Sequence, residues 1–229
     1  MFTNLFQSSD VVATTFEAAI VATLAGGTLS LLGLSWVSER WRVPLALAGV
    51  AVLVSCFGYL QAAGLWLATH SASSAYRYIV WFTVQPMQVA SIYFLARIAG
   101  RVPIGVFWRI VVAAVLMVLS RYLGEMHAFN PTLGVLLSIA FWLYILGEMY
   151  FGAMAEVLRH ASRPMRTAYF WIRLIFTIGW AFYPILSFTD LVIGAGYSSG
   201  VIVIYTIADF FNLLVVSLIV LTVAALERY

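Results

Sequence analysis

Residues Val203–Leu214 read Val-Ile-Tyr-Thr-Ile-Ala-Asp-Phe-Phe-Asn-Leu-Leu, and they place one carboxylate, Asp209, in the middle of a long apolar run. An ionised side chain at the centre of a membrane-spanning helix costs at least ~2.5 kcal/mol on insertion scales. Asp209 therefore needs polar partners inside a helix bundle. The stretch predicts a buried polar site within a membrane protein.

The composition extends this interpretation to the whole chain. Its 229 residues are 64% hydrophobic and 9% charged, with a mean hydropathy of +1.01, so too little polar surface exists to cover a water-soluble globule. Apolar runs predict seven spans, near residues 11–36, 44–68, 76–98, 104–123, 131–157, 166–189 and 199–225. We expect an all-α membrane protein, with one seven-helix transmembrane domain over residues 1–229.

All 12 basic residues are arginine, and the chain contains no lysine. Most of them fall in the first, third and fifth connections and at the C-terminus: Arg40, Arg42, Arg97, Arg101, Arg159, Arg163, Arg166 and Arg228. Because basic residues favour the cytoplasmic side, we expect the N-terminus outside, the C-terminus in the cytoplasm, and membrane lipid as the partner of this cluster. We find no nucleic-acid motif, and a bacterial inner membrane is the expected location.

Other ionisable residues inside the predicted spans also require partners. Arg77 opens the third span toward the outer side, and we expect it to form one polar network with Asp209. Glu148 and Arg173 should lie at similar depth in the fifth and sixth spans, which predicts a buried ion pair that Arg109 can join.

Two spans share a tryptophan followed by a proline. Trp81 precedes Pro86 by five residues, and Trp180 precedes Pro184 by four, so each ring lies about one turn from a kink. This geometry is suited to walling a cavity, to which Trp142 of the fifth span can contribute. The alternative is that these rings simply pack the bundle.

These features together resemble the microbial rhodopsin family. The third span resembles the family pattern Arg-Tyr-x-Asp-Trp-x-x-x-Thr-Pro, the sixth resembles Trp-x-x-Tyr-Pro, and the seventh resembles Asp-x-x-x-Lys. The residues that carry the resemblance are Arg77, Tyr78, Trp81, Pro86, Trp180, Tyr183, Pro184 and Asp209. Tyr59 resembles the family tyrosine that hydrogen-bonds the same aspartate. The resemblance implies a retinal pocket, vestigial or non-covalent, at Trp81, Pro86, Trp142, Trp180, Tyr183 and Leu213.

The chain departs from the family pattern at the positions that bind retinal covalently and transfer protons. Leu213 stands where the family lysine forms a Schiff base with retinal, and arginine cannot replace that amine. The proton-acceptor position is Val80, the threonine one turn later is Val84, and the proton-donor position is Ser91. One cation and one anion are thus missing together, so Arg77 and Asp209 still balance in charge.

We therefore expect a rhodopsin-like membrane protein without covalent retinal that is not a light-driven proton pump. It would bind a retinoid or carotenoid non-covalently, or contact a retinal-biosynthesis enzyme or a cytosolic regulator. The alternatives are a passive or gated ion pathway past Arg77 and Asp209, and a structural remnant of a rhodopsin. We identify no catalytic residues and no metal-ligand set, and expect no enzyme activity. The resemblance also implies a homo-oligomer.

Overall fold

The computed structural model of the chain describes residues 10–72, 74–193 and 198–227. In chain order, its elements are α1 (Val11–Leu32), the 3₁₀ turn η2 (Gly33–Ser35), α2 (Glu39–Thr69), α3 (Ser74–Ala99), α4 (Ile104–Glu125), α5 (Pro131–Phe151), α6 (Ala153–Arg159), α7 (Arg163–Leu174), the π-helix η3 (Ile175–Gly179), α8 (Trp180–Ile193), α9 (Ser199–Asp209), the π-helix η4 (Phe210–Val215) and α10 (Val216–Leu226). Arg228, one of the arginines assigned to the cytoplasmic side, lies outside the described residues.

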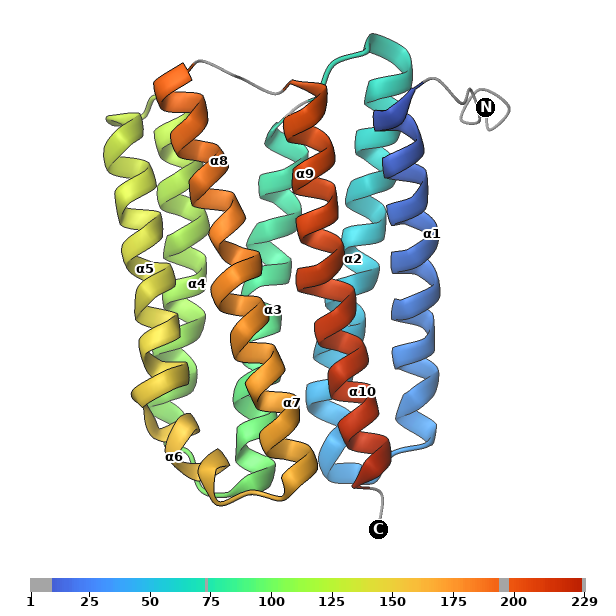
Figure 1. Cartoon of the computed structure of the whole chain (residues 1–229), viewed down its shortest axis with the longest axis vertical. Helices are drawn as coiled ribbons and strands as arrows, with labels where there is room; N and C mark the ends of the chain where they lie inside the picture. Colours follow the sequence, from blue (N-terminus) through green and yellow to red (C-terminus); the bar gives the residue numbers. More distant parts are fainter. Residues whose placement is uncertain (1–9, 73, 194–197, 228–229) are drawn as a thin grey trace.

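The helices pack side by side, and α1 begins at the end of the bundle opposite to the end where α10 finishes (Figure 1). Within the described ranges, seven segments are long and apolar enough to cross a membrane: Val11–Ser35, Glu39–Thr69, Tyr76–Ala99, Ile104–Glu125, Pro131–Arg159, Arg163–Thr189 and Ser199–Leu226. The predicted seven-helix membrane bundle is therefore confirmed.

Two boundaries differ from the prediction for identifiable reasons. The second span begins at Glu39 rather than near residue 44, because Trp41 and Leu45 are fully buried and the acidic first turn suits a helix N-terminus. Pro44 is accommodated inside this helix. The fifth span breaks at Gly152, whose extended backbone separates α5 from the short helix α6.

Helix α3 lies at the centre of the bundle and contacts α2 and α4 extensively. Its inner side chains, Ile92, Tyr93 and Leu95, are almost completely buried and belong to a large core cluster that also contains Trp180. Helix α3 and the last two spans contribute many of the residues that line the candidate site, and the packing of this core holds those residues in place.

Small residues bring two neighbouring helices into backbone contact. A Cβ atom placed on Gly134 of α5 would lie 2.7 Å from the Ser120 carbonyl oxygen and 2.8 Å from Gly124 Cα, both in α4. Close approach of this kind is how membrane helices gain packing energy without a hydrophobic driving force. The glycines therefore set the α4–α5 distance.

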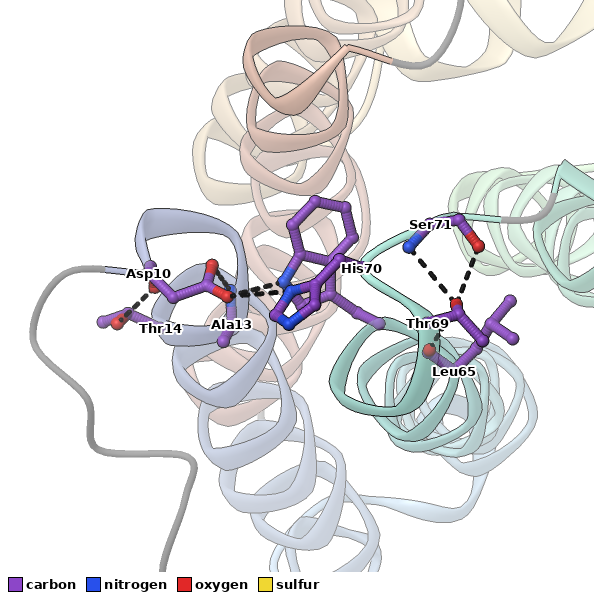
Figure 2. Close-up of polar contacts among 8 residues, drawn as sticks. Asp10, Ala13, Thr14, Leu65, Thr69, His70 and Ser71 are labelled. Atoms are coloured by element: carbon purple, nitrogen blue, oxygen red, sulfur yellow. Dashed lines mark hydrogen bonds and ion pairs between the residues drawn. The ribbon is translucent and has the colours of Figure 1, made fainter.

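A polar cluster joins the start of α1 to the end of α2. The Asp10 Oδ1 atom accepts a hydrogen bond from the Ala13 backbone N–H at 3.0 Å and caps α1 (Figure 2). Its Oδ2 atom accepts a hydrogen bond from Trp66 Nε1 at 2.8 Å and lies 4.0 Å from His70 Nδ1. One carboxylate thus ties together two helix ends.

We expect Gly134→Ala to destabilise the bundle by about 1–3 kcal/mol, since the added methyl group meets backbone atoms that cannot turn aside. Gly147→Ala, on the same helix, is the matched control because no heavy atom lies within 4 Å of its added Cβ. Unfolding in a denaturing detergent measures both. Equal effects of the two substitutions would contradict the close α4–α5 contact.

We also expect the link at Asp10 to weaken in acid. Its hydrogen bonds, first from Ala13 N–H and also from Trp66, hold the pKa of Asp10 below its usual value of 3.8. A lowered folded-state pKa contributes stability above the unfolded-state pKa, which is lost as pH falls through the folded value. Asp10→Asn keeps a capping side chain but removes the charge, so the variant should be less stable than the wild type at pH 7. This difference should shrink below about pH 4, where Asp10 of the wild type also becomes protonated. Thermal melts of both proteins from pH 7 to pH 3 measure this, and a constant deficit would refute it.

Candidate functional site

Asp209 ends α9 at the point where η4 begins, and its side chain is buried with two tyrosine partners. Tyr59 of α2 donates its hydroxyl hydrogen to Asp209 Oδ2 at 3.0 Å, and Tyr183 of α8 donates to Oδ1. The predicted contact between Tyr59 and Asp209 is confirmed. Both carboxylate oxygens therefore accept hydrogen bonds from helices on opposite sides.

Aromatic rings lie between Arg77 and this carboxylate and connect the two residues. Its guanidinium carbon lies 4.0 Å from the ring centroid of Tyr205 and 5.6 Å from that of Trp81. The Tyr205 ring stacks on Tyr183, with centroids 6.0 Å apart and planes 13° apart. Arg77 and Asp209 also line one small cavity of about 50 Å³. The geometry therefore places both residues in one network, with cation–π contacts as its links.

A second cavity lies between α3, α4, α5 and α8, and has a volume of about 40 Å³. Four of the six residues predicted to form a retinal pocket line it: Trp81, Trp142, Trp180 and Tyr183. Pro86 and Leu213, the other two, are not among its lining residues. At this volume the cavity is narrow, with room for a few water molecules.

Two of the residues that line this aromatic cavity each carry a buried polar atom without a hydrogen-bond partner among the described residues. The Gln85 Oε1 atom, an acceptor, and the Trp180 Nε1–H group, a donor, are both buried without a hydrogen bond. Buried polar groups normally find partners, so an orphaned donor and acceptor beside the same cavity favour a polar molecule or group within it.

A partly buried ionic cluster that the sequence analysis did not predict lies beside the aromatic cavity. Arg121 Nη2 lies 3.3 Å from Glu125 Oε2, and Arg121 Nε donates a hydrogen bond to Ser187 Oγ at 2.9 Å. The Tyr78 hydroxyl donates to the same Glu125 oxygen at 2.6 Å. The i,i+4 spacing of Arg121 and Glu125 on a helix was the signal that could have revealed the pair.

Three of the four positions predicted to depart from the rhodopsin pattern lie together. Val84 and Leu213 are buried in one apolar cluster with Ala51, Val52 and Leu214, and Val80 packs against it. Ser91, at the proton-donor position, instead donates a hydrogen bond to the Pro44 carbonyl oxygen at 2.8 Å.

The predicted ion pair between Glu148 and Arg173 is wrong. Glu148 pairs with Arg109 of α4, with Nη2 and Oε1 2.8 Å apart. The Arg173 guanidinium carbon lies 4.7 Å from the ring centroid of Tyr150 and 4.9 Å from that of Tyr169. Arg173 thus contacts two tyrosine faces in place of the predicted carboxylate.

The π-helices place further side-chain contacts around the site. Trp142 Nε1 donates a hydrogen bond to the Phe176 carbonyl oxygen in η3 at 3.0 Å, and Gln88 Nε2 donates to the Asn212 carbonyl oxygen in η4 at 2.5 Å. Both acceptors lie in segments where the backbone departs from α-helical bonding. The bond to the Phe176 carbonyl oxygen holds Trp142 at the edge of the aromatic cavity.

Comparison with known proteins agrees with this architecture. The family model described as "Bacteriorhodopsin-like protein" matches residues 10–226. The green-light absorbing proteorhodopsin of Gamma-proteobacterium EBAC31A08 is 27% identical over 222 residues, which cover 96% of this chain and 89% of that protein. Among solved structures, the blue light-absorbing proteorhodopsin from Med12 superposes with a TM-score of 0.80 at 25% identity, covering 96% of this chain and 100% of that one.

The structure of thermophilic rhodopsin superposes with a TM-score of 0.85 at 24% identity, covering 95% of this chain and 93% of that one. The fold is thus shared over nearly the whole length of each protein. The family match spans all seven membrane helices, from Asp10 to Leu226. The chain therefore belongs to the bacteriorhodopsin-like family of integral membrane proteins, the microbial rhodopsins.

Proposed function

We propose that this chain is a non-pumping microbial rhodopsin homologue that binds a retinoid or carotenoid without a covalent bond. The family implies a retinal chromophore. The observation that supports our proposal most strongly is the pairing of a retained aromatic cavity with an apolar Leu213 at the attachment position.

The side chains do not fit the covalent form of the cofactor. A Schiff base needs a neutral primary amine, and none of the 229 residues is a lysine. The guanidinium of arginine stays protonated and is a poor nucleophile. Leu213 is 4% exposed and packs against other apolar side chains, so its surroundings also lack a place for a charged amine.

The aromatic cavity offers the features that a non-covalent polyene would use. The rings of Trp81, Trp142, Trp180 and Tyr183 line it. Its orphaned donor, Trp180 Nε1–H, could hydrogen-bond a carbonyl oxygen. Its narrow volume of about 40 Å³ means that a flat ligand must part the lining side chains, of which Met117 is the most adaptable.

The residues for proton transport do not support pumping. Val80 and Val84 cannot accept a proton, and the Ser91 hydroxyl is engaged with a backbone carbonyl. A pump needs groups that change protonation state along a path. We propose instead that the bound retinoid is held unreacted, so that the protein responds to retinoid supply and contacts an enzyme or regulator of retinal metabolism.

We expect all-trans retinal to quench the tryptophan fluorescence of the purified protein saturably, while borohydride yields no retinyl adduct by mass spectrometry. Ser138→Trp should weaken this binding roughly tenfold, because Ser138 lines the cavity and the larger ring fills it. Leu143→Trp, at a lipid-exposed position of α5, is the matched control. Absence of saturable quenching would contradict retinoid binding, and a borohydride-trapped adduct would contradict the non-covalent mode.

We further expect Leu213→Lys combined with Val80→Asp to give a visible absorption band when retinal is added. The two changes restore the amine and its counter-ion at the positions that the family uses. Adding Met117→Ala should increase the yield of coloured protein, since it widens the cavity. Well-folded protein that stays colourless in both backgrounds would show that the retained rings no longer form a retinal pocket.

A further inference from the structure

An apolar groove lies between the sixth and seventh spans, separate from the aromatic cavity. It has a volume of about 460 Å³ and extends along α7, η3 and α8 on one side and along α9 and η4 on the other, helices that lie at the front of the view in Figure 1. The side chains at its rim, Trp171, Phe182, Ile207 and Phe211, are between 43% and 53% exposed. The groove therefore opens toward the membrane and is large enough for a lipid-soluble molecule.

The floor of the groove is unusual because both walls contain a π-helix there. η3 contacts η4, and each contributes one floor residue, Gly179 and Asn212 respectively. Gly179 has no side chain, and a Cβ atom at that position would lie 1.8 Å from Asn212 Oδ1. The amide of Asn212 therefore occupies the space beside Gly179, at the base of the groove.

The hydrogen-bond network fixes which end of this amide faces Gly179. Tyr183 gives its one hydroxyl hydrogen to Asp209, so towards any other partner its oxygen can only accept a hydrogen bond. That donor is Asn212 Nδ2, 2.9 Å away. With its nitrogen committed to Tyr183, Asn212 must direct Oδ1 to the other side, which is the side of Gly179.

Asn212 is only 1% exposed, yet its Oδ1 atom accepts no hydrogen bond from the residues that the structure describes. A buried amide oxygen without a donor is costly in apolar surroundings. The remaining walls of the groove are almost entirely aliphatic or aromatic. Oδ1 itself is covered by its neighbours, so a molecule in the groove that displaces them could make one polar contact with Asn212, in which it would have to be the donor.

We propose that this groove binds a membrane-dissolved alcohol, with a rigid or branched apolar body of the polyene or isoprenoid class and its hydroxyl group donating to Asn212 Oδ1. An aldehyde, an ester or an acyl chain has no such hydrogen to give. The aromatic and branched rim favours an unsaturated or branched body over a flexible straight chain. This second site does not depend on ligand binding in the aromatic cavity.

All-trans retinol and retinyl acetate form a suitable pair of probes, because the acetate lacks the donor hydrogen. Energy transfer from tryptophan to each probe, titrated in detergent micelles, gives the two affinities. We expect wild-type protein to prefer retinol by about three- to tenfold, the size expected of one buried hydrogen bond. Asn212→Leu should remove this preference.

Thr206→Val is the matched control, because it also removes a buried polar group from the seventh span but lies outside the groove. It should keep the preference. Ile207→Trp, which fills the groove from its exposed rim, should weaken retinol binding without disturbing the core, and it tests the site even where Asn212→Leu fails to fold.

Equal affinity for the two probes in the wild type would overturn the proposal. It would indicate that acyl chains of the bilayer occupy the groove. A preference that survives Asn212→Leu and Ile207→Trp, but is lost in Ser138→Trp, would also overturn it. That second outcome would assign the alcohol to the aromatic cavity and would leave the proposed function intact.

Discussion

The rest of the site depends on the need to satisfy one carboxylate in the membrane interior. Asp209 is buried in the middle of the seventh span, where an unpartnered charge would oppose insertion and folding. Two tyrosine hydroxyls, from α2 and α8, donate to it, and Arg77 contributes positive charge through the stacked rings. Because these partners come from three other spans, the second, third and sixth, satisfying Asp209 also fixes how those spans are arranged around the seventh.

The fold could be predicted from sequence because hydrophobicity and length decide which segments cross a membrane. The contact between Tyr59 and Asp209 could be anticipated from the family motif. The choice of partner for Glu148 could not, because Arg109 and Arg173 were both candidates and only helix rotation decides between them. The cluster of Arg121 with Tyr78 and Ser187 depends on contacts between distant segments, which spacing along the chain does not reveal.

The two π-helices are a further feature that periodicity does not predict, since they depend on support from neighbouring helices. Trp142 donates to a carbonyl oxygen of η3, and Gln88 donates to one of η4. Each contact stabilises a backbone that deviates from α-helical hydrogen bonding at membrane depth, where water is absent. The deviation brings Gly179 and Asn212 together, and so creates the polar floor beneath an otherwise apolar groove.

The missing lysine is best understood as part of a repacked region rather than as a single lost group. A lysine lost alone would leave the remaining carboxylates with too little positive charge, and a lost acceptor carboxylate alone would leave a buried cation. In our proposal, Val80, Val84 and Leu213 replace the charged and polar groups together, and these three side chains meet in one apolar cluster. The cluster has no ionisable group to satisfy, whereas Asp209 keeps both of its tyrosine donors. A lysine placed at Leu213 alone would therefore put a charge among apolar side chains, which is why our proposal pairs that change with a carboxylate at Val80.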